Sequence, residues 1–242
     1  MPKFLKIAHR GYSAKYPENT IPAFAKAIEA GADMIELDLH LSGDDELVVI
    51  HDDTINRTSD GRGKVAELGL PVLKRYNYNN GMKNCGFVPI STLAEVIASV
   101  GKQVLLNIEI KRQPPEKAGI EKELVNLLRK ENFIDRVIVS SFDCGILIKI
   151  KELAAEIKTG LIYKNPIKTF RELVRELDVS SLHPSIALVD AVALRWAKAC
   201  GLLVYPWVVK DRRTIAAYRE TGFIDGAIVN DLGLFAAADQ RN

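Results

Sequence analysis

The segment Met34-Ile-Glu-Leu-Asp-Leu-His-Leu41 alternates between apolar and polar side chains along most of its length. Successive side chains of a β-strand point to opposite faces, so this pattern predicts a strand with one wholly apolar face. That face suits packing against helices, which leaves the other face for the interior of a barrel. The apolar face carries Ile35, Leu37, Leu39 and Leu41, and the polar face carries Glu36, Asp38 and His40.

Short strands of this kind recur along the chain and alternate with amphipathic helical segments. The alternation predicts a closed parallel TIM (β/α)8 barrel, which typically takes about 250 residues. An open doubly wound sheet is the alternative, because the number of strands does not prove closure. We predict main strands at 4–8, 34–41, 104–110, 137–140, 160–163, 179–182, 202–209 and 226–229, and helices at about 19–31, 92–100, 116–130, 146–157, 168–178, 188–200 and 211–221.

The segment 56–89 interrupts this alternation. It is rich in Gly, Asn and Tyr and follows a predicted hairpin strand at 46–50 that pairs with the second main strand. We interpret it as a small insertion after the second strand rather than as a second domain. Residues 1–242 are therefore expected to form one barrel domain.

The composition argues against several classes of partner and location. A formal net charge of +2 is too small to indicate nucleic acid or an anionic membrane surface as the main partner. The three cysteines lie far apart, without the spacing of a zinc site or a disulfide framework. No stretch reaches the roughly 18 apolar residues that span a bilayer. We expect a cytoplasmic protein without a transmembrane segment, and the sequence does not define its oligomeric state.

A second set of polar side chains faces the same interior. In Asn107-Ile-Glu-Ile-Lys111 the isoleucines face the helices, so Glu109 joins Glu36 and Asp38 in one small volume. Buried carboxylates must take up protons, pair with bases or bind a cation. An all-carboxylate set favours a hard divalent ion, Mg²⁺ or Ca²⁺, and the alternative is an ion-pair network in which Arg10 and Lys111 neutralise the three acids.

Two histidines follow predicted apolar strands, at the edge where barrel enzymes carry their active sites. His9 ends the first strand, and His51 follows the hairpin strand 46–50. Histidine carries protons near neutral pH, so one could act as general base and the other as general acid. Arg10 adds a planar, permanently charged group that suits phosphate. Beside the three acids, these residues favour a metal-dependent phosphodiester hydrolase over an ion-pair network.

A set of short motifs occurs in a fixed order from His9 to the last strand. The motifs are His9-Arg-Gly11, Pro17-Glu-Asn-Thr20, Glu36-Leu-Asp38, Val48-Val-Ile-His-Asp52, Asn56-Arg-Thr58, Asn107-Ile-Glu-Ile-Lys111 and Trp207. With this set the chain resembles the glycerophosphodiester phosphodiesterases, in their single-domain bacterial and archaeal form. The set is far more specific than any one of its motifs.

The resemblance implies a TIM barrel with an insertion after the second strand, and a function for each candidate residue. One divalent ion, Mg²⁺ or Ca²⁺, would lie between three carboxylates, and two histidines would exchange protons with the substrate. The implied roles are metal ligands for Glu36, Asp38 and Glu109, general acid and base for His9 and His51, phosphate binding for Arg10 and Lys111, and substrate binding for Trp207.

The family's substrates are diesters of glycerol 3-phosphate, and its products are glycerol 3-phosphate and an alcohol. The reaction is thought to begin with attack by the glycerol 2-hydroxyl, which fits a chain without a Ser or Cys nucleophile elbow. Two alternatives remain: a barrel phosphodiesterase acting on lysophospholipids or other phospholipid headgroups, and a silent phosphodiester-binding protein. Lys210 stands where the family pattern has an asparagine after Trp207, so the sequence leaves the preferred headgroup open.

Overall fold

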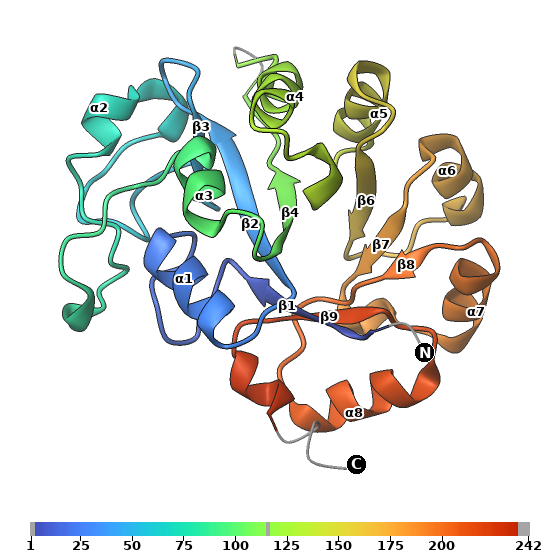
Figure 1. The fold of residues 1–242 in the computed structure, drawn as a ribbon. Helices are drawn as coiled ribbons and strands as arrows, with labels where there is room; N and C mark the ends of the chain where they lie inside the picture. The colour runs from blue at the N-terminus through green and yellow to red at the C-terminus, as the bar shows by residue number, and fades with distance from the viewer. Residues whose placement is uncertain (1–2, 115–116, 237–242) are drawn as a thin grey trace.

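The computed structural model describes residues 3–114 and 117–236. Eight parallel strands form a nearly closed barrel in the order β8-β7-β6-β5-β4-β2-β1-β9, and β3 pairs antiparallel with β2 (Figure 1). The TIM barrel expected from the sequence is confirmed. The strands are β1 (Leu5–His9), β2 (Met34–Leu41), β3 (Leu47–Val49), β4 (Leu105–Ile110), β5 (Val137–Ser141), β6 (Lys158–Tyr163), β7 (Ser181–Pro184), β8 (Leu203–Val204) and β9 (Gly226–Val229).

Helices lie between the strands and surround them (Figure 1). The third predicted helix was expected to start at Glu116, which lies outside the described residues; α4 itself begins after Gly119, whose φ is 100°. Within the described ranges, no helix is long and apolar enough to cross a membrane. The helices around the barrel are α1 (Ile21–Glu29), α3 (Leu93–Val100), α4 (Ile120–Lys130), α5 (Cys144–Leu153), α6 (Phe170–Leu177), α7 (Ala191–Ala199) and α8 (Arg212–Thr221).

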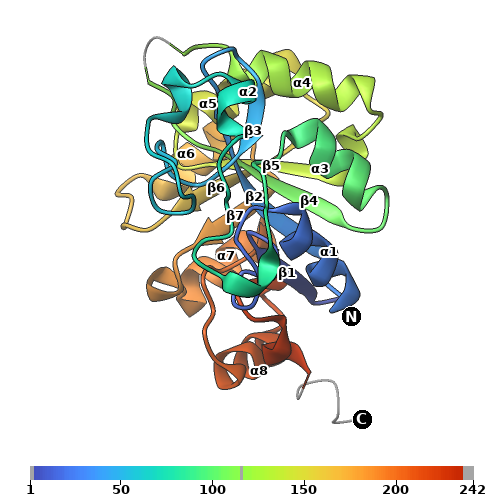
Figure 2. The same ribbon diagram turned by 90° about the vertical axis from the view of Figure 1, so that its left-hand side faces the viewer.

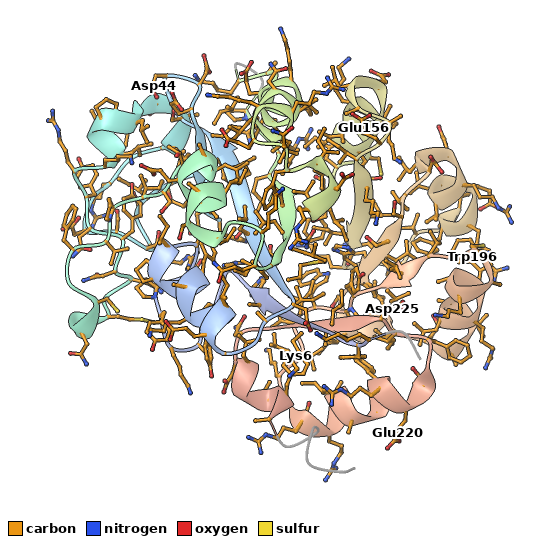
Figure 3. The ribbon with its side chains drawn as sticks, in the orientation of Figure 1. Lys6, Asp44, Glu156, Trp196, Glu220 and Asp225 are labelled. Carbon is orange, nitrogen blue, oxygen red and sulfur yellow. The ribbon has the colours of Figure 1, made fainter. Side chains whose placement is uncertain are left out.

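The barrel closes between β8 and β9 through separate hydrogen bonds rather than a regular strand pair. The strand predicted at 202–209 is wrong in extent, because only Leu203–Val204 is regular and Pro206 has no N–H to donate. Val209 N donates to Ile228 O at 2.9 Å, and Ile228 N donates to Pro206 O at 3.0 Å. The carboxylate of Asp225, labelled in Figure 3, accepts from Val204 N at 3.0 Å.

The inner face of the strands changes from apolar to polar toward their carboxyl ends. On β1, Ile7 is followed two residues later by His9, and on β2, Met34 is followed by Glu36. Apolar side chains therefore fill the barrel interior near the amino ends of the strands, and we call them the apolar plug. The charged side chains lie nearer the carboxyl ends. The plug consists of the buried residues Ile7, Met34, Ile138, Tyr205 and Ile228.

The insertion after β3 packs against the barrel through apolar side chains of its own. It contains the short helix α2 (Leu70–Leu73) and 3₁₀ turns at Val65–Glu67 and Lys83–Cys85. In Figure 2, which faces this side of the molecule, the insertion (teal) runs along the near side of the barrel. Its buried side chains form one cluster with those of the β3 segment: Val48, Ile50, Ile55, Val65, Leu73, Tyr78 and Ile90.

Candidate active site

Strand register brings the three predicted metal ligands together. Within the parallel pairs, Glu36 lies beside His9 of β1 and Asn107 of β4, and Asp38 lies beside Glu109. Side chains at paired positions share one face, so Glu36, Asp38 and Glu109 all point inward. One carboxylate oxygen from each lies within 4.8 Å of the others, and all three residues are buried.

Asp38 is the most fully engaged of the three acids. Arg10 Nε lies 3.1 Å from its Oδ2, and Lys111 Nζ lies 2.8 Å from its Oδ1. Lys111 also forms an ion pair with Glu109. Asn19 Nδ2 donates to Asp38 Oδ2 at 2.7 Å, so this amide supports the acid rather than capping α1. Arg10 and Lys111 therefore both bind the triad, as the ion-pair alternative required.

These two cations do not balance three acids. Burial and the neighbouring Asp38 raise the pKa of Glu36 well above its usual range, and the same two causes raise the pKa of Glu109 to about 7. Although burial opposes ionisation of Asp38, Lys111 and Arg10 hold the pKa of that carboxyl below its usual range. With all three carboxylates ionised, the triad would carry one negative charge more than Arg10 and Lys111 balance, and the donors are carboxylate oxygens. The triad therefore fits a hard divalent cation and could hold one.

Backbone conformation fixes Arg10 beside the triad. Its N–H donates to Glu36 O at 2.8 Å and to Glu36 Oε2 at 3.0 Å. The φ angles of Arg10 and Gly11 are 57° and 79°, in the left-handed region that favours glycine. A Cβ at Gly11 would lie 2.8 Å from Ala23, so glycine is required for the turn to pack on α1.

The two histidines have different partners. His9 Nδ1 lies 2.6 Å from Asn230 Oδ1, and its Nε2 lies 3.9 Å from Glu36 Oε2. His51 Nδ1 lies 2.6 Å from the carboxylate of Asp52. Burial and the neighbouring Arg10 lower the pKa of His9 to about 4, so this imidazole is neutral at pH 7. Burial also lowers the pKa of His51.

A network of charged side chains connects His51 to Arg10. Arg57 donates to Glu18 at 2.9 and 2.8 Å and to Asp52 at 2.7 and 2.9 Å. Glu18 in turn accepts from Arg10 Nη1 at 2.9 Å. We call Glu18, Asp52 and Arg57 the guanidinium clamp. It joins the end of β1, the loop before α1, the end of the β3 segment and the first residues of the insertion.

One pocket of about 230 Å³ is lined by most of the candidate site residues. Every predicted site residue lines it except Asp38, which is fully buried behind the others. Trp207 forms part of the wall, and its Nε1 donates to His183 O at 2.8 Å. The lining residues are His9, Arg10, Glu36, His51, Asn107, Glu109, Lys111, Phe142, Ile162, Lys164, His183, Trp207 and Ile228.

Several of these positions were missed by the sequence analysis. Phe142 and Lys164 line the pocket, and Asn230 holds His9. Each lies one residue beyond a strand end, which is the only signal that could have indicated them. Lys210, the departure noted in the sequence, is exposed and is not among the residues that line this pocket.

Fold and site together define a TIM-barrel protein with a charge-rich pocket at the carboxyl ends of its strands, the edge on which barrel enzymes carry their active sites. The chain belongs to the glycerophosphoryl diester phosphodiesterase family, whose family model matches residues 9–234.

Individual relatives match over nearly the whole chain. A glycerophosphodiester phosphodiesterase of Caldanaerobacter subterraneus subsp. tengcongensis is 38% identical over 95% of this chain and 95% of its own. The structure of an Oleispira antarctica phosphodiesterase, in complex with the product sn-glycerol-3-phosphate, superposes with a TM-score of 0.88 at 29% identity and covers 99% of this chain and 98% of its own. A Thermotoga maritima glycerophosphodiester phosphodiesterase is 32% identical, with a TM-score of 0.79 over 98% of this chain and 99% of its own.

Glu36→Gln should stabilise the metal-free protein at neutral and alkaline pH. The folded-state pKa of Glu36 is raised above its unfolded value near 4.5, so the folded protein binds more protons. The free energy of unfolding of the wild type therefore falls as pH rises above 4.5. The amide of Glu36→Gln does not ionise, so the variant avoids this loss of stability. We expect the Tm of the variant, measured by calorimetry after chelation, to exceed that of the wild type at pH 8 by a few degrees.

Added Mg²⁺ or Ca²⁺ should reverse the order of thermal stability of the wild type and Glu36→Gln. At a hundredfold excess over its Kd, the ion should stabilise the wild type by about 2.7 kcal/mol, or roughly 5–10 °C. Glu36→Gln should gain much less. The control is Glu220→Gln, an exposed acid on α8 that is labelled in Figure 3 and should respond like the wild type. An equal gain in Glu36→Gln would exclude the triad as the binding site.

Proposed function

We propose that the protein hydrolyses glycerophosphodiesters to glycerol 3-phosphate and an alcohol, with one divalent ion and two histidines. The observation that carries the proposal is that three acids, two histidines and two basic side chains meet at one pocket. The relative at 38% identity is named for this activity, and the solved structure at 29% identity holds its product.

The divalent ion, Mg²⁺ or Ca²⁺, would be held by Glu36, Asp38 and Glu109. When bound, it screens the phosphate charge and lowers the pKa of a nearby hydroxyl. Arg10 and Lys111 already line the pocket beside the triad, so their donors can also bind the phosphate oxygens. Trp207 would provide an apolar wall against the bound substrate.

The nucleophile in this proposal belongs to the substrate. The glycerol 2-hydroxyl loses its proton to one histidine and attacks phosphorus, and the leaving alcohol takes a proton from the other histidine. Water then opens the cyclic phosphate with the two roles reversed. An intramolecular nucleophile gains several kcal/mol from proximity, so no Ser or Cys nucleophile is needed.

The partners of the two histidines support different roles. Asp52 lies 2.6 Å from His51 Nδ1, and a carboxylate at this position stabilises the imidazolium that forms when Nε2 accepts a proton. His9 has the neutral amide of Asn230 instead. We therefore assign His9, which is neutral at pH 7, as the base that activates the 2-hydroxyl, and His51, whose imidazolium Asp52 stabilises, as the acid that protonates the leaving alcohol.

The aromatic side chains of the insertion bear on the alternative of a lipid substrate. A lipid substrate would favour an exposed aromatic rim on the insertion, but Tyr78 is buried and only Phe87, at 61% exposed, stands out among its described aromatic side chains. The pocket and the family favour the water-soluble diester.

All three cysteines are free thiols, which supports the proposal that the protein acts in the reducing cytoplasm.

His9→Ala and His51→Ala should each lower kcat for glycerophosphodiesters by about 10²- to 10⁴-fold, because each removes a proton-transfer group. The measurement is glycerol 3-phosphate release, with far-ultraviolet circular dichroism to show that the fold is kept. Near-normal turnover in either variant would refute the assignment of that histidine.

Chelation should abolish the same activity. We expect EDTA to remove turnover and excess Mg²⁺ or Ca²⁺ to restore it, because the proposed reaction needs the ion held by the triad to screen the phosphate charge and activate the hydroxyl. EDTA that has first been saturated with the same ion serves as the control and should have no effect. Full activity after exhaustive chelation would favour the ion-pair alternative.

Arg57→Ala should lower kcat by roughly 10- to 100-fold, because Asp52 and hence His51 lose the group that orients them. Guanidinium ion added in solution should restore part of the loss, which a general destabilisation would not allow. Arg62→Ala removes an exposed arginine of the same insertion and should leave kcat unchanged. If Arg57→Ala keeps wild-type kcat, the clamp does not position His51.

A further inference from the structure

The pocket has a charged inner end and a more open mouth. The predicted metal ligands, the histidines and the phosphate-binding side chains lie together at the inner end. Phe142, at 43% exposed, and the exposed Lys164 mark the mouth. A bound phosphodiester with its phosphorus at the inner end therefore extends one of its two alcohols past Phe142 and Lys164.

The charge at this mouth is positive. The lining includes only two carboxylates, Glu36 and Glu109, and both belong to the triad. Among the residues that the structure describes, no carboxylate forms an ion pair with Lys164. Asp143, next to Phe142 in the chain, is engaged elsewhere: it accepts from Gly145 N at 2.9 Å and lies 3.9 Å from Arg112 Nε.

The aromatic surface at the mouth is also occupied. Phe142 and Trp207 meet edge to face, with ring centroids 5.7 Å apart. Lys164 Nζ lies over the Phe142 ring, 5.9 Å from its centroid. A quaternary ammonium binds by placing its charge over such a ring, so it would have to displace a like charge from Phe142.

Only the leaving alcohol can be selected by this charge. The glycerol moiety is uncharged and common to all substrates of the proposed reaction, whereas the second alcohol differs in charge and size. Because the second alcohol also needs the more open end, we place it at the mouth. The Lys164 ammonium at the mouth attracts an anionic alcohol and repels an ammonium group. It donates hydrogen bonds to the hydroxyls of a polyol and accepts none itself.

We infer that Lys164 determines leaving-group specificity, and that the enzyme prefers diesters of neutral polyols or anionic alcohols over those of choline. The inference rests on the proposed function, because it requires hydrolysis of glycerophosphodiesters. It also moves the source of headgroup preference from Lys210, the departure noted in the sequence, to a residue that lines the pocket.

The test compares kcat/KM for glycerophosphoglycerol with kcat/KM for glycerophosphocholine, using metal-loaded enzyme. We expect the polyol-to-choline ratio to exceed one in the wild type. Lys164→Gln should lower the ratio roughly two- to fivefold, as expected for one exposed charge, and Lys164→Glu should lower it by roughly the square of that factor. The effect should shrink as salt is raised to about 0.5 M, because exposed charges are screened.

Lys210→Glu is the matched control, since it reverses the charge of an exposed lysine that is not among the pocket-lining residues. Its ratio should stay near that of the wild type, and thermal melts should show that all three variants fold. A wild-type preference for choline, an unchanged ratio in both Lys164 variants, or an equal shift in Lys210→Glu would overturn the inference. Absence of turnover of both diesters would instead refute the proposed function on which it rests.

Discussion

Three carboxylates buried within 4.8 Å of one another are the constraint on which the rest of the site depends. Such a group is expensive in a protein interior unless positive charge lies beside it. Arg10 and Lys111 supply two charges, and Asn19 supplies a donor to Asp38. The left-handed backbone at Arg10 and Gly11 holds that guanidinium beside the triad. If all three acids are ionised, one negative charge remains beyond those that Arg10 and Lys111 balance, and a bound divalent cation could balance it.

The central part of this site could be predicted from the sequence because strand geometry is local. Alternation along β2 and β4 is enough to put Glu36, Asp38 and Glu109 on one face, and the observed register makes them neighbours. A histidine at the end of β1 needs no long-range information either. The same reasoning gave the eight-stranded barrel, since repeated strands and helices have few other arrangements.

What the sequence could not predict depends on contacts between distant segments. Asn230 reaches His9 across 221 positions of sequence, and only closure of the barrel between β9 and β1 brings them together. Lys164 was overlooked and Lys210 was singled out, because a motif compares positions along the chain and does not reveal which side chain faces the pocket. The strand expected at 202–209 failed for a local reason, the missing N–H of Pro206, which the apolar pattern concealed.

The insertion is coupled to the candidate active site rather than merely attached to the barrel. Its second residue, Arg57, bonds both Glu18 and Asp52, so the segment cannot move away without releasing the partners of Arg10 and His51. The pocket thus joins two electrostatic demands. The inner end gathers three carboxylates that could hold a cation, whereas the mouth carries Lys164, which has no carboxylate partner among the described residues and disfavours a cation. A phosphodiester bound between them would present its anionic phosphate to the ion and to Arg10 and Lys111, with its second alcohol beside Lys164. Charge would therefore orient the substrate along the pocket before any contact specific to glycerol forms.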